Sequence, residues 1–373
     1  MLEKDVKFLE EVFKKYYFEH FDLIHTPQNP EMREFGYQKF NGGMNRHITL
    51  KSDKELHLLL MTQVPSDVYC SNARYSFPNL PMAEKDWQGA ELIFDIDAKD
   101  LNLPCRVNHT CKKCTNCANV FANSDKCPAC NAAKFETTSV LCNECISAAK
   151  NEVKKLVNVL TLDFGIKKEN ISVFFSGNEG FHVYASSTNY EKLDSKQRAE
   201  LVDYVMLKGA LPETFGAKYN FAKSQFADVD DKGWPGRVSK YIFGSKSNKP
   251  KISKQLISEG YAAFKKRLED AQKEIGVKVD PNVTIDVHRI FRLGGTLNSK
   301  SGLTKMFCQD LAKFNPSIDA CYVDDDKVTV TVNCPVEFKL KHKKFGPYKN
   351  EQITVPKYAA VYMICKGYAT FAC

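Results

Sequence analysis

The sequence has no long apolar segment, and this absence excludes membrane-spanning proteins. No apolar run in the chain approaches the ~20 residues that a helix needs to cross a bilayer. The N-terminal residues Met1–Asp5 are charged and have no signal-peptide core, so we expect no export. Internal repeats and low-complexity tails are missing as well. The sequence therefore predicts a globular intracellular protein without a membrane partner.

The residues that are present give an ordinary globular composition with a small excess of positive charge. A length of 373 residues allows one large domain or two of average size, with ample chain for a core. The formal net charge of +8 favours a polyanionic partner, although solubility alone accounts for a value of this size. Composition thus indicates a globular protein but does not indicate a particular activity.

The 14 cysteines are unevenly placed, because eight of them lie between Cys105 and Cys145. Disulfide scaffolds are typical of small secreted chains, whereas CxxC pairs in a long chain without a signal peptide indicate zinc in a reducing compartment. Four thiolates with zinc-ribbon spacing would close a tetrahedral structural site. These four are Cys114, Cys117, Cys127 and Cys130.

A second candidate zinc set lies at the base of this ribbon and consists of Cys105, His109, Cys142 and Cys145. Its CxxC pair leads into a helix predicted from Ile146, and a helix N-terminus favours thiolate. Cys111 is left over and can exchange with Cys114; the simpler alternative is one zinc ion and several free thiols. Scattered cysteines outside the block are predicted to be buried thiols: Cys70, Cys308, Cys321, Cys334, Cys365 and Cys373.

The segment Glu91–Asp97 is predicted to be a short β-strand. Side chains at i and i+2 share a face of a strand, so Asp95 and Asp97 point the same way. Two carboxylates on one face repel each other unless a cation lies between them, and hard oxygen ligands suit Mg²⁺ or Mn²⁺. Enzymes hold metal-bound phosphates at such sites. The alternative is a strand end with two solvated aspartates.

Ser176–His182 is predicted to link two paired strands, Ile171–Phe175 and Phe181–Tyr184. Its two glycines allow a ligand to approach the backbone closely, and Ser176 with nearby N–H groups can donate to phosphate. His182 can donate from its ring to the same group. The alternative is a glycine turn with a packed histidine.

A third segment, Asp286–Arg292, adds a carboxylate and fixed cations. If it is extended, Asp286 and His288 share a face, and Asp286 can join the other two aspartates. Arg289 and Arg292 are permanent cations suited to phosphate, and the Gly-rich loop that follows contributes Lys300. The alternative is an ion-paired strand followed by a turn.

Hydrophobic periodicity gives a coarse map of the other elements. Helices are predicted over residues 3–21 and from Ile146 onward, and residues 56–64 form a strand or a short helix. Residues 67–75 form another strand. Residues 190–275 are predicted to be a helical subdomain broken at Trp234-Pro235-Gly236. A second β region begins near Thr284, with a hairpin made of residues 328–332 and 336–340.

Taken in order, these motifs resemble the small catalytic subunit of archaeal and eukaryotic DNA primases, the archaeal form most closely. The resemblance covers most of the chain and rests on Arg33-Glu34-Phe35, Met44-Asn45-Arg46-His47, Phe94-Asp95-Ile96-Asp97, the cysteine block, Ser176-Gly177-x2-Gly180-x-His182 and Asp286-x-His288-Arg289-x2-Arg292. It implies catalytic, metal-binding roles for Asp95, Asp97 and Asp286. It also implies nucleotide-binding roles for Arg46, Ser176, His182, Arg289, Arg292 and Lys300.

The resemblance also implies a fold and partners. The fold is α/β (α+β): one catalytic domain over residues 1–373, with a mixed sheet, an RRM-like layer, a helical subdomain at 190–275 and a zinc insertion at 105–145. Two Mg²⁺ or Mn²⁺ ions would support template-directed synthesis of short RNA or DNA primers on single-stranded DNA from nucleoside triphosphates, with release of pyrophosphate. The expected partner is a large subunit bearing an iron–sulfur cluster. The expected location of this chain is the cytoplasm or nucleoid of an archaeon.

Two positions depart from the family pattern, and other activities compete with the primase interpretation. Asn298 stands where a histidine is expected, and Glu179 where some relatives carry a basic residue. A metal-dependent nuclease also needs clustered carboxylates, but has less use for a triphosphate cradle. A zinc module that binds nucleic acid leaves the three aspartates unexplained. A repair polymerase of the same superfamily differs in being unable to start a chain.

Overall fold

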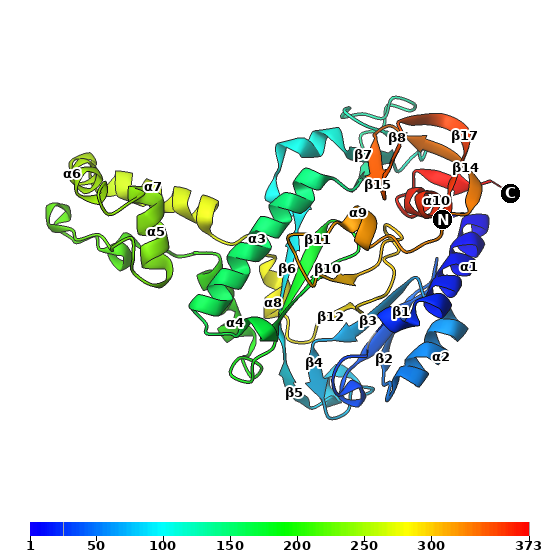
Figure 1. The fold of residues 1–373 in the computed structure, drawn as a ribbon, viewed down its shortest axis with the longest axis horizontal. Helices are drawn as coiled ribbons and strands as arrows, with labels where there is room; N and C mark the ends of the chain where they lie inside the picture. The colour runs from blue at the N-terminus through cyan, green and yellow to red at the C-terminus, as the bar shows by residue number, and fades with distance from the viewer. Residues whose placement is uncertain (25, 373) are drawn as a thin grey trace.

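Two four-stranded sheets face each other at the centre of the molecule (Figure 1). The computed structural model describes residues 1–24 and 26–372. The first sheet has the order β12 (Ile290–Arg292), β3 (Asp67–Ser71), β1 (Phe35–Gln38), β2 (Met44–Ile48). The second has the order β13 (Met306–Phe307), β10 (Ile171–Phe175), β11 (Gly180–Ala185), β6 (Leu92–Asp97). Ile93, Tyr184 and Phe291 pack together between the two sheets.

Amphipathic helices cover the outer faces of these sheets. α3 (Asn143–Leu162) packs on β6 and β11 through the apolar stripe that the sequence predicts, including Ile146, Val153 and Leu160. α1 (Glu3–Glu19) buries one apolar face, as predicted. Of the predicted segment 56–64, residues 56–63 are helical within α2 (Asp53–Gln63), and Val64 follows the helix. α2 begins where the Ser52 hydroxyl accepts from the N–H of Glu55. Residues of both sheets, including Ile93, Tyr184 and Phe291, line a cavity between them.

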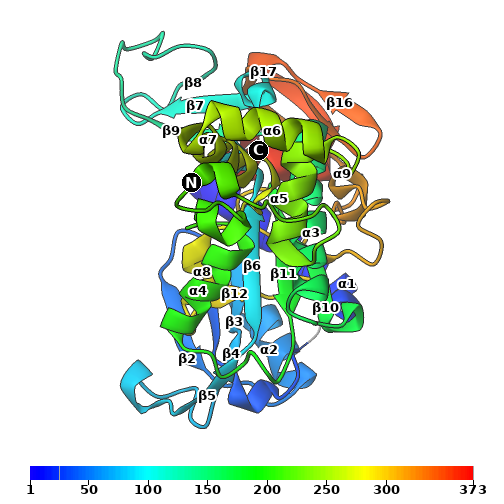
Figure 2. The same ribbon diagram turned by 90° about the vertical axis from the view of Figure 1, so that its left-hand side faces the viewer.

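The region 190–275 contains α4 (Ser195–Val205), α5 (Gly233–Phe243), α6 (Lys249–Glu259) and α7 (Tyr261–Ile275). α5, α6 and α7 form an arm that projects from the body (Figure 1), and Figure 2 views this arm end-on. The predicted break at Trp234-Pro235-Gly236 is wrong, because these residues form the first turn of α5. Proline is tolerated in a first turn, where its missing N–H would have no helical partner.

The C-terminal part forms a separate three-stranded sheet. β14 (Lys327–Cys334) lies between β17 (Tyr348–Pro356) and β18 (Ala369–Phe371), and α10 (Lys357–Cys365) packs on it. The predicted hairpin of residues 328–332 with 336–340 is therefore wrong. The chain leaves β14 to form a small hairpin of β15 (Phe338–Leu340) and β16 (Lys343–Phe345), and only then returns beside β14 as β17.

Two further expectations need correction. Every described strand pairing is antiparallel, so the sheets are not mixed. Parallel strands need long crossovers, whereas β10 and β11 are joined by a short turn. Thr284 lies in a short helix, α8 (Pro281–Ile285), and not at the start of a β region.

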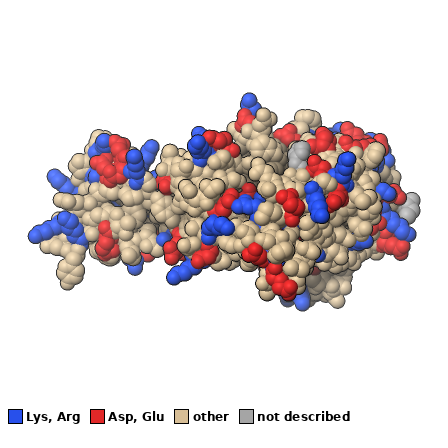
Figure 3. Space-filling model, turned by 90° about the horizontal axis from the view of Figure 1, so that it is seen from below, with Lys and Arg blue, Asp and Glu red and all other residues tan. Residues whose placement is uncertain are grey.

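Further elements are β4 (Ala73–Tyr75), which pairs with β5 (Trp87–Ala90), the short helix α9 (Pro316–Asp319) and several short 3₁₀ helices. Within residues 1–24 and 26–372, no helix has both the length and the apolar character that a membrane span requires. Acidic and basic side chains are interspersed along the face shown in Figure 3, on the body and on the arm. The positive net charge is therefore not gathered into one basic patch on that face.

Candidate active site

Asp95 and Asp97 lie on one face of β6, as the alternation of the strand predicts. The neighbouring strand β11 places His182 opposite Asp95 and Gly180 opposite Asp97. Position 180 admits only glycine without movement, since a Cβ there would lie 2.4 Å from Oδ1 of Asp97 and 2.4 Å from the carbonyl oxygen of Ile96. The strand pairing therefore brings the aspartate motif and the glycine turn of the sequence to one place.

Asp95 is mostly buried, with 19% of its side chain exposed. Its Oδ1 has no hydrogen-bond partner within the described chain, and Nε2 of His182 lies 3.5 Å away, too far for a good hydrogen bond. Burial, and next the charge of Asp97, raise the pKa of Asp95 to about 7. A carboxylate that is buried, unpaired and repelled by a neighbour fits a divalent hard cation, which would supply the missing charge.

Lys99 and Asp280 complete the surroundings of this pair. Nζ of Lys99 lies 2.8 Å from Oδ2 of Asp97. The N–H of Asp280 donates to the carbonyl oxygen of Asp95 at 3.0 Å, and the Asp280 charge is a further cause of the raised pKa of Asp95. We did not expect Asp280 from the sequence. Its signal was an aspartate directly before Pro281, a typical helix N-cap, and its side chain accepts from the N–H of Asn282 at 3.0 Å.

Asp286 occupies a different position from the one predicted. The segment around it is a turn between α8 and β12 and not an extended strand, so Asp286 and His288 do not share a strand face. Asp286 is exposed, and its Oδ1 accepts from the N–H of His288 at 2.9 Å. Within the described residues, the oxygens of Asp95, Asp97 and Asp286 do not all lie within 4.8 Å of one another.

His182 and Lys305 lie on the inner side of the sheet, and burial acts on both. Burial, and next the charge of Lys305, hold the pKa of His182 well below its usual range. Its Nδ1 is buried and has no partner within the described chain. Burial, and next the charge of Arg292, lower the pKa of Lys305 to about 7. Sequence reasoning missed Lys305, because it follows the Gly-rich loop without any pattern of its own.

The turn between β10 and β11 is held by its own serine and by the Gly-rich loop. Oγ of Ser176 accepts from the N–H groups of Asn178 at 3.4 Å and Gly180 at 3.3 Å. Asn298, which stands where a histidine was expected, is buried and donates from Nδ2 to the carbonyl oxygen of Ser176 at 3.2 Å. The hydroxyl of Ser301 donates to the carbonyl oxygen of Gly177. The two segments thus form one connected pair of loops beside Asp97.

Of the predicted cations, Arg46 and Arg292 are engaged in ion pairs, whereas Arg289 and Lys300 form none within the described residues. Arg46 donates from Nε and Nη2 to the buried carboxylate of Glu34, at 2.9 and 3.2 Å. Arg292 pairs with Asp67. Arg289 and Lys300 have exposed side chains, and the charge of Arg289 acts on both Asp95 and His182.

Glu179 lies in the turn and meets two cations from distant parts of the chain. Nη1 of Arg106 lies 3.2 Å from its Oε2, and Nζ of Lys366 lies 3.8 Å from its Oε1. Lys366 also donates to Oδ1 of Asn178 at 2.8 Å, and burial lowers the pKa of Lys366 to about 8. Glu179 is acidic, so the basic charge at this turn comes from Arg106 and Lys366, which lie elsewhere in the chain.

The two predicted cysteine sets come together as two separate groups. Within each set, all four ligand atoms lie within 4.8 Å of one another. In the ribbon, the sulfur atoms of Cys114 and Cys130 lie 3.6 Å apart, and those of Cys117 and Cys127 lie 3.5 Å apart. Zinc–sulfur bonds of about 2.3 Å in a tetrahedron place sulfur atoms about 3.8 Å apart. The ribbon geometry therefore fits zinc.

The second set fits a metal equally well and lies directly beside Arg106. Sγ of Cys145 is 3.6 Å from Sγ of Cys105 and 3.4 Å from Nε2 of His109. Cys111 belongs to neither set, because it is buried in the main core. Among the scattered cysteines, Cys365 is half-buried, Cys373 lies outside the described residues, and the other four are buried.

The ribbon strands are β7 (Thr110–Cys114), β8 (Val120–Phe121) and β9 (Phe135–Ser139). They dock on the C-terminal sheet: Nδ2 of Asn333 donates to the carbonyl oxygen of Val120 at 3.2 Å, and the hydroxyls of Thr138 and Tyr368 lie 2.8 Å apart. The ribbon is thus hydrogen-bonded to the C-terminal part of the chain through β8 and β9.

Comparison with known proteins gives a consistent result. A family model described as DNA primase small subunit matches residues 132–307. The DNA primase small subunit of Nitrosopumilus maritimus is 58% identical over 373 residues, and that of Cenarchaeum symbiosum is 50% identical; both alignments cover all of each chain. The DNA primase small subunit of Archaeoglobus fulgidus is 30% identical over 98% of each chain.

Proposed function

Because the chain belongs to the DNA primase small subunit family, we propose that it synthesises short RNA or DNA primers on single-stranded DNA. The reaction is nucleotidyl transfer: the 3′-oxygen of the growing chain bonds to the α-phosphorus of a nucleoside triphosphate, and pyrophosphate leaves. The observation that carries this proposal is the pairing of Asp95 with His182 and of Asp97 with Gly180 across two adjacent strands. This pairing sets the two carboxylates beside the turn of residues 176–182, which supports one site for the metals and the triphosphate.

Asp95 and Asp97 are proposed to hold Mg²⁺ or Mn²⁺, with Asp286 as the third ligand. Bound divalent metals would supply Lewis acidity to the attacking hydroxyl and to the triphosphate. The carboxylate of Asp286 is exposed and, within the described residues, accepts a hydrogen bond only from its own turn, so it can join the pair when cations remove the repulsion between them. Asp280, whose backbone already contacts Asp95, is the alternative third carboxylate.

The triphosphate is proposed to lie along the turn beside Asp97. Ser176, His182, Arg292, Arg289, Lys300 and Arg46 would bind it. His182 is neutral in the free protein, so one ring nitrogen carries a proton and can donate it to a phosphate oxygen. Arg289 and Lys300 are exposed and can approach the ligand, whereas Arg292 would exchange part of its contact with Asp67 for phosphate.

The remaining features of this proposal concern architecture and partners. The β13-β10-β11-β6 sheet with α3 would be the RRM-like layer of a single catalytic domain, and 105–145 and 190–275 would be its zinc-binding and helical parts. Zn²⁺ would be structural in both cysteine sets, since each set offers four ligands and no open position. The partner would be a primase large subunit, in the cytoplasm at the nucleoid of an archaeon.

The test is primer synthesis without a primer. The purified chain is incubated with single-stranded DNA, labelled nucleoside triphosphates and Mg²⁺ or Mn²⁺. New short oligonucleotides that disappear in Asp95→Ala support the proposal. Extension of an added primer only would indicate that initiation needs the large subunit or that the chain is a repair polymerase. Cleavage of the DNA, or activity retained in Asp95→Ala, would contradict the assignment.

A further inference from the structure

A cavity of about 770 Å³ lies between the two central sheets, beside the candidate active site. Tyr184 and Ile93 line it, and they stand two residues along β11 and β6 from His182 and Asp95. Two residues of a strand span about 7 Å. Asp95, Asp97, Ser176 and His182 do not line the cavity, whereas Arg292 does. The cavity therefore adjoins the proposed metal and triphosphate positions and shares Arg292 with the latter.

Aromatic side chains supply much of the wall. The rings of Phe174 and Tyr184 lie 5.4 Å apart, and Phe291 lies 6.3 Å from Tyr184 on the opposite sheet. Phe307 stands at the rim with 51% of its surface exposed, 5.5 Å from Phe174. Flat, apolar faces of this kind accept a planar ring. A volume of about 770 Å³ lies within the range of about 300–1,000 Å³ typical of small-molecule sites.

Hydrogen-bond donors remain available on one side of the cavity. Nζ of Lys305 donates to the hydroxyl of Tyr184 and to the carbonyl oxygen of Arg292, each at 2.7 Å, and forms no ion pair within the described chain. In its protonated form Lys305 has three N–H donors, so one of them is left over. The Tyr184 hydroxyl accepts from Lys305 and keeps its own hydrogen to donate. A ligand acceptor would satisfy both groups.

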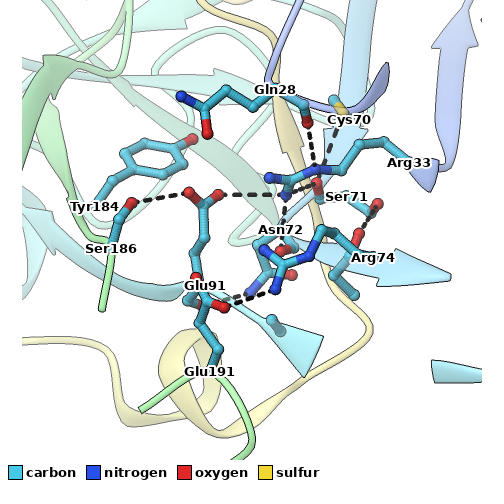
Figure 4. A network of polar contacts seen from close by, with 12 residues as sticks. Gln28, Arg33, Cys70, Ser71, Asn72, Arg74, Glu91, Tyr184, Ser186 and Glu191 are labelled. Carbon is cyan, nitrogen blue, oxygen red and sulfur yellow. Dashed lines mark hydrogen bonds and ion pairs between the residues drawn. The ribbon is translucent and has the colours of Figure 1, made fainter. Parts of the chain in front are cut away.

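An acceptor remains available at the other side, where Figure 4 shows a polar network. Glu91 accepts from the hydroxyl of Ser186 at 2.9 Å and from Nη1 of Arg33 at 3.2 Å. Nδ2 of Asn72 donates to the backbone oxygen of Glu91 at 3.1 Å, which fixes the orientation of the amide. Its Oδ1 is buried without a partner in the described residues. Such an unpaired buried acceptor is costly unless a ligand donor meets it.

We propose that this cavity binds a nucleobase. The planar ring would pack against Phe174 and Tyr184, a carbonyl or ring nitrogen would accept from Lys305 or Tyr184, and an exocyclic amine would donate to Asn72. A nucleobase combines a flat apolar face with donors and acceptors on one edge, which is the combination that the cavity offers. The base can belong to a free nucleotide or to a nucleic-acid strand that leaves the neighbouring active site.

The test uses nucleosides in EDTA. Nucleosides lack phosphates and EDTA removes divalent metals, so neither group that the proposed triphosphate position needs is present. Binding of adenosine, guanosine, cytidine and uridine is measured by saturation-transfer NMR and titration. Tyr184→Phe keeps the ring and removes the hydroxyl, and we expect about tenfold weaker binding from the lost hydrogen bond. Phe307→Ala should weaken binding as well. Its matched control is Phe77→Ala, since Phe77 is similarly exposed (54%) and lies outside the cavity.

The outcomes separate the proposal from the assignment of the active site. Nucleoside binding that Tyr184→Phe and Phe307→Ala weaken, and Phe77→Ala leaves unchanged, supports the proposal. No binding at millimolar nucleoside, or equal effects of Phe307→Ala and Phe77→Ala, would overturn it even if primer synthesis is normal. A single-stranded oligonucleotide that displaces the nucleoside, when an abasic strand of equal length does not, identifies a base of the strand as the ligand. Lack of displacement identifies a free nucleotide.

Discussion

Asp95→Asn should stabilise the metal-free protein at pH 8 while removing primer synthesis. In the unfolded chain an aspartate ionises near pH 3.9, whereas burial and the charge of Asp97 raise the pKa of Asp95 to about 7 in the folded protein. Between these values, the folded state keeps a proton that the unfolded state has released. Rising pH therefore favours unfolding, and the loss of stability is complete above about pH 7.

The size of the effect follows from the two pKa values. A difference of one in pKa between the folded and unfolded states corresponds to about 1.4 kcal/mol. Ionisation of Asp95 therefore lowers the free energy of unfolding by about 4 kcal/mol at most above pH 7, and by about 1.5 kcal/mol at pH 5. Asparagine has nearly the same shape and carries no proton to lose. With an unfolding entropy of about 2.1 cal/mol/K for each residue, about 4 kcal/mol corresponds to a rise in Tm of roughly 5 °C.

The measurement is thermal unfolding of the wild type and of Asp95→Asn in EDTA at pH 5 and pH 8. Asp203→Asn serves as a control, because this carboxylate is 58% exposed on α4 and should change stability by less than about 0.5 kcal/mol. Adding Mn²⁺ at pH 8 should raise the Tm of the wild type much more than that of Asp95→Asn. A variant that is no more stable than the wild type at pH 8, or equally stabilised at both pH values, would refute the reasoning.

Three further substitutions test the surroundings of the site. Gly180→Ala should cost about 1–3 kcal/mol of stability and most of the primer synthesis, because the new Cβ displaces Asp97; equal Tm and activity would contradict this contact. Arg106→Gln should raise KM for nucleoside triphosphate more than it lowers kcat. The reason is that Glu179, in the turn between β10 and β11 where the triphosphate is proposed to bind, loses one of its two cations; an unchanged KM would rule out a role of Arg106 in binding the triphosphate. Cys127→Ser should lower the zinc content, measured by elemental analysis, from two ions for each chain to one; an unchanged content would show that the ribbon binds none.

Local patterns of the sequence predicted the central strand and the clustering of the four ribbon cysteines correctly. The alternation around Asp95 depends only on the period of a strand, and the ribbon cysteines depend only on spacing along the chain. The turn between β10 and β11 was readable for the same reason. Each of these features is decided by residues that are near in sequence, so no knowledge of the tertiary structure was required.

The segment around Asp286 shows why other predictions were wrong. Its apolar and polar residues alternate like those of a strand, but Pro281 follows an N-capping aspartate and starts a helix that ends just before Asp286. The ion-pair partners of the arginines could not be predicted either. Asp67 and Arg292, for example, lie on paired strands that are far apart in the sequence. Ion pairs of this kind are fixed by strand order, which short-range patterns do not contain.

Burial drives three ionisable groups near the cleft toward their neutral forms. The pKa of Asp95 is raised, whereas the pKa values of His182 and Lys305 are lowered. In all three the largest cause is burial, which disfavours the charged form of an acid and of a base alike. A fold selected for stability alone would place apolar side chains at such positions. In the proposed site, this cost would be offset when cations meet Asp95 and anionic phosphate meets His182, since each ligand favours the charged form. The free site is therefore electrostatically strained in the direction that binding of a metal-bound nucleotide relieves.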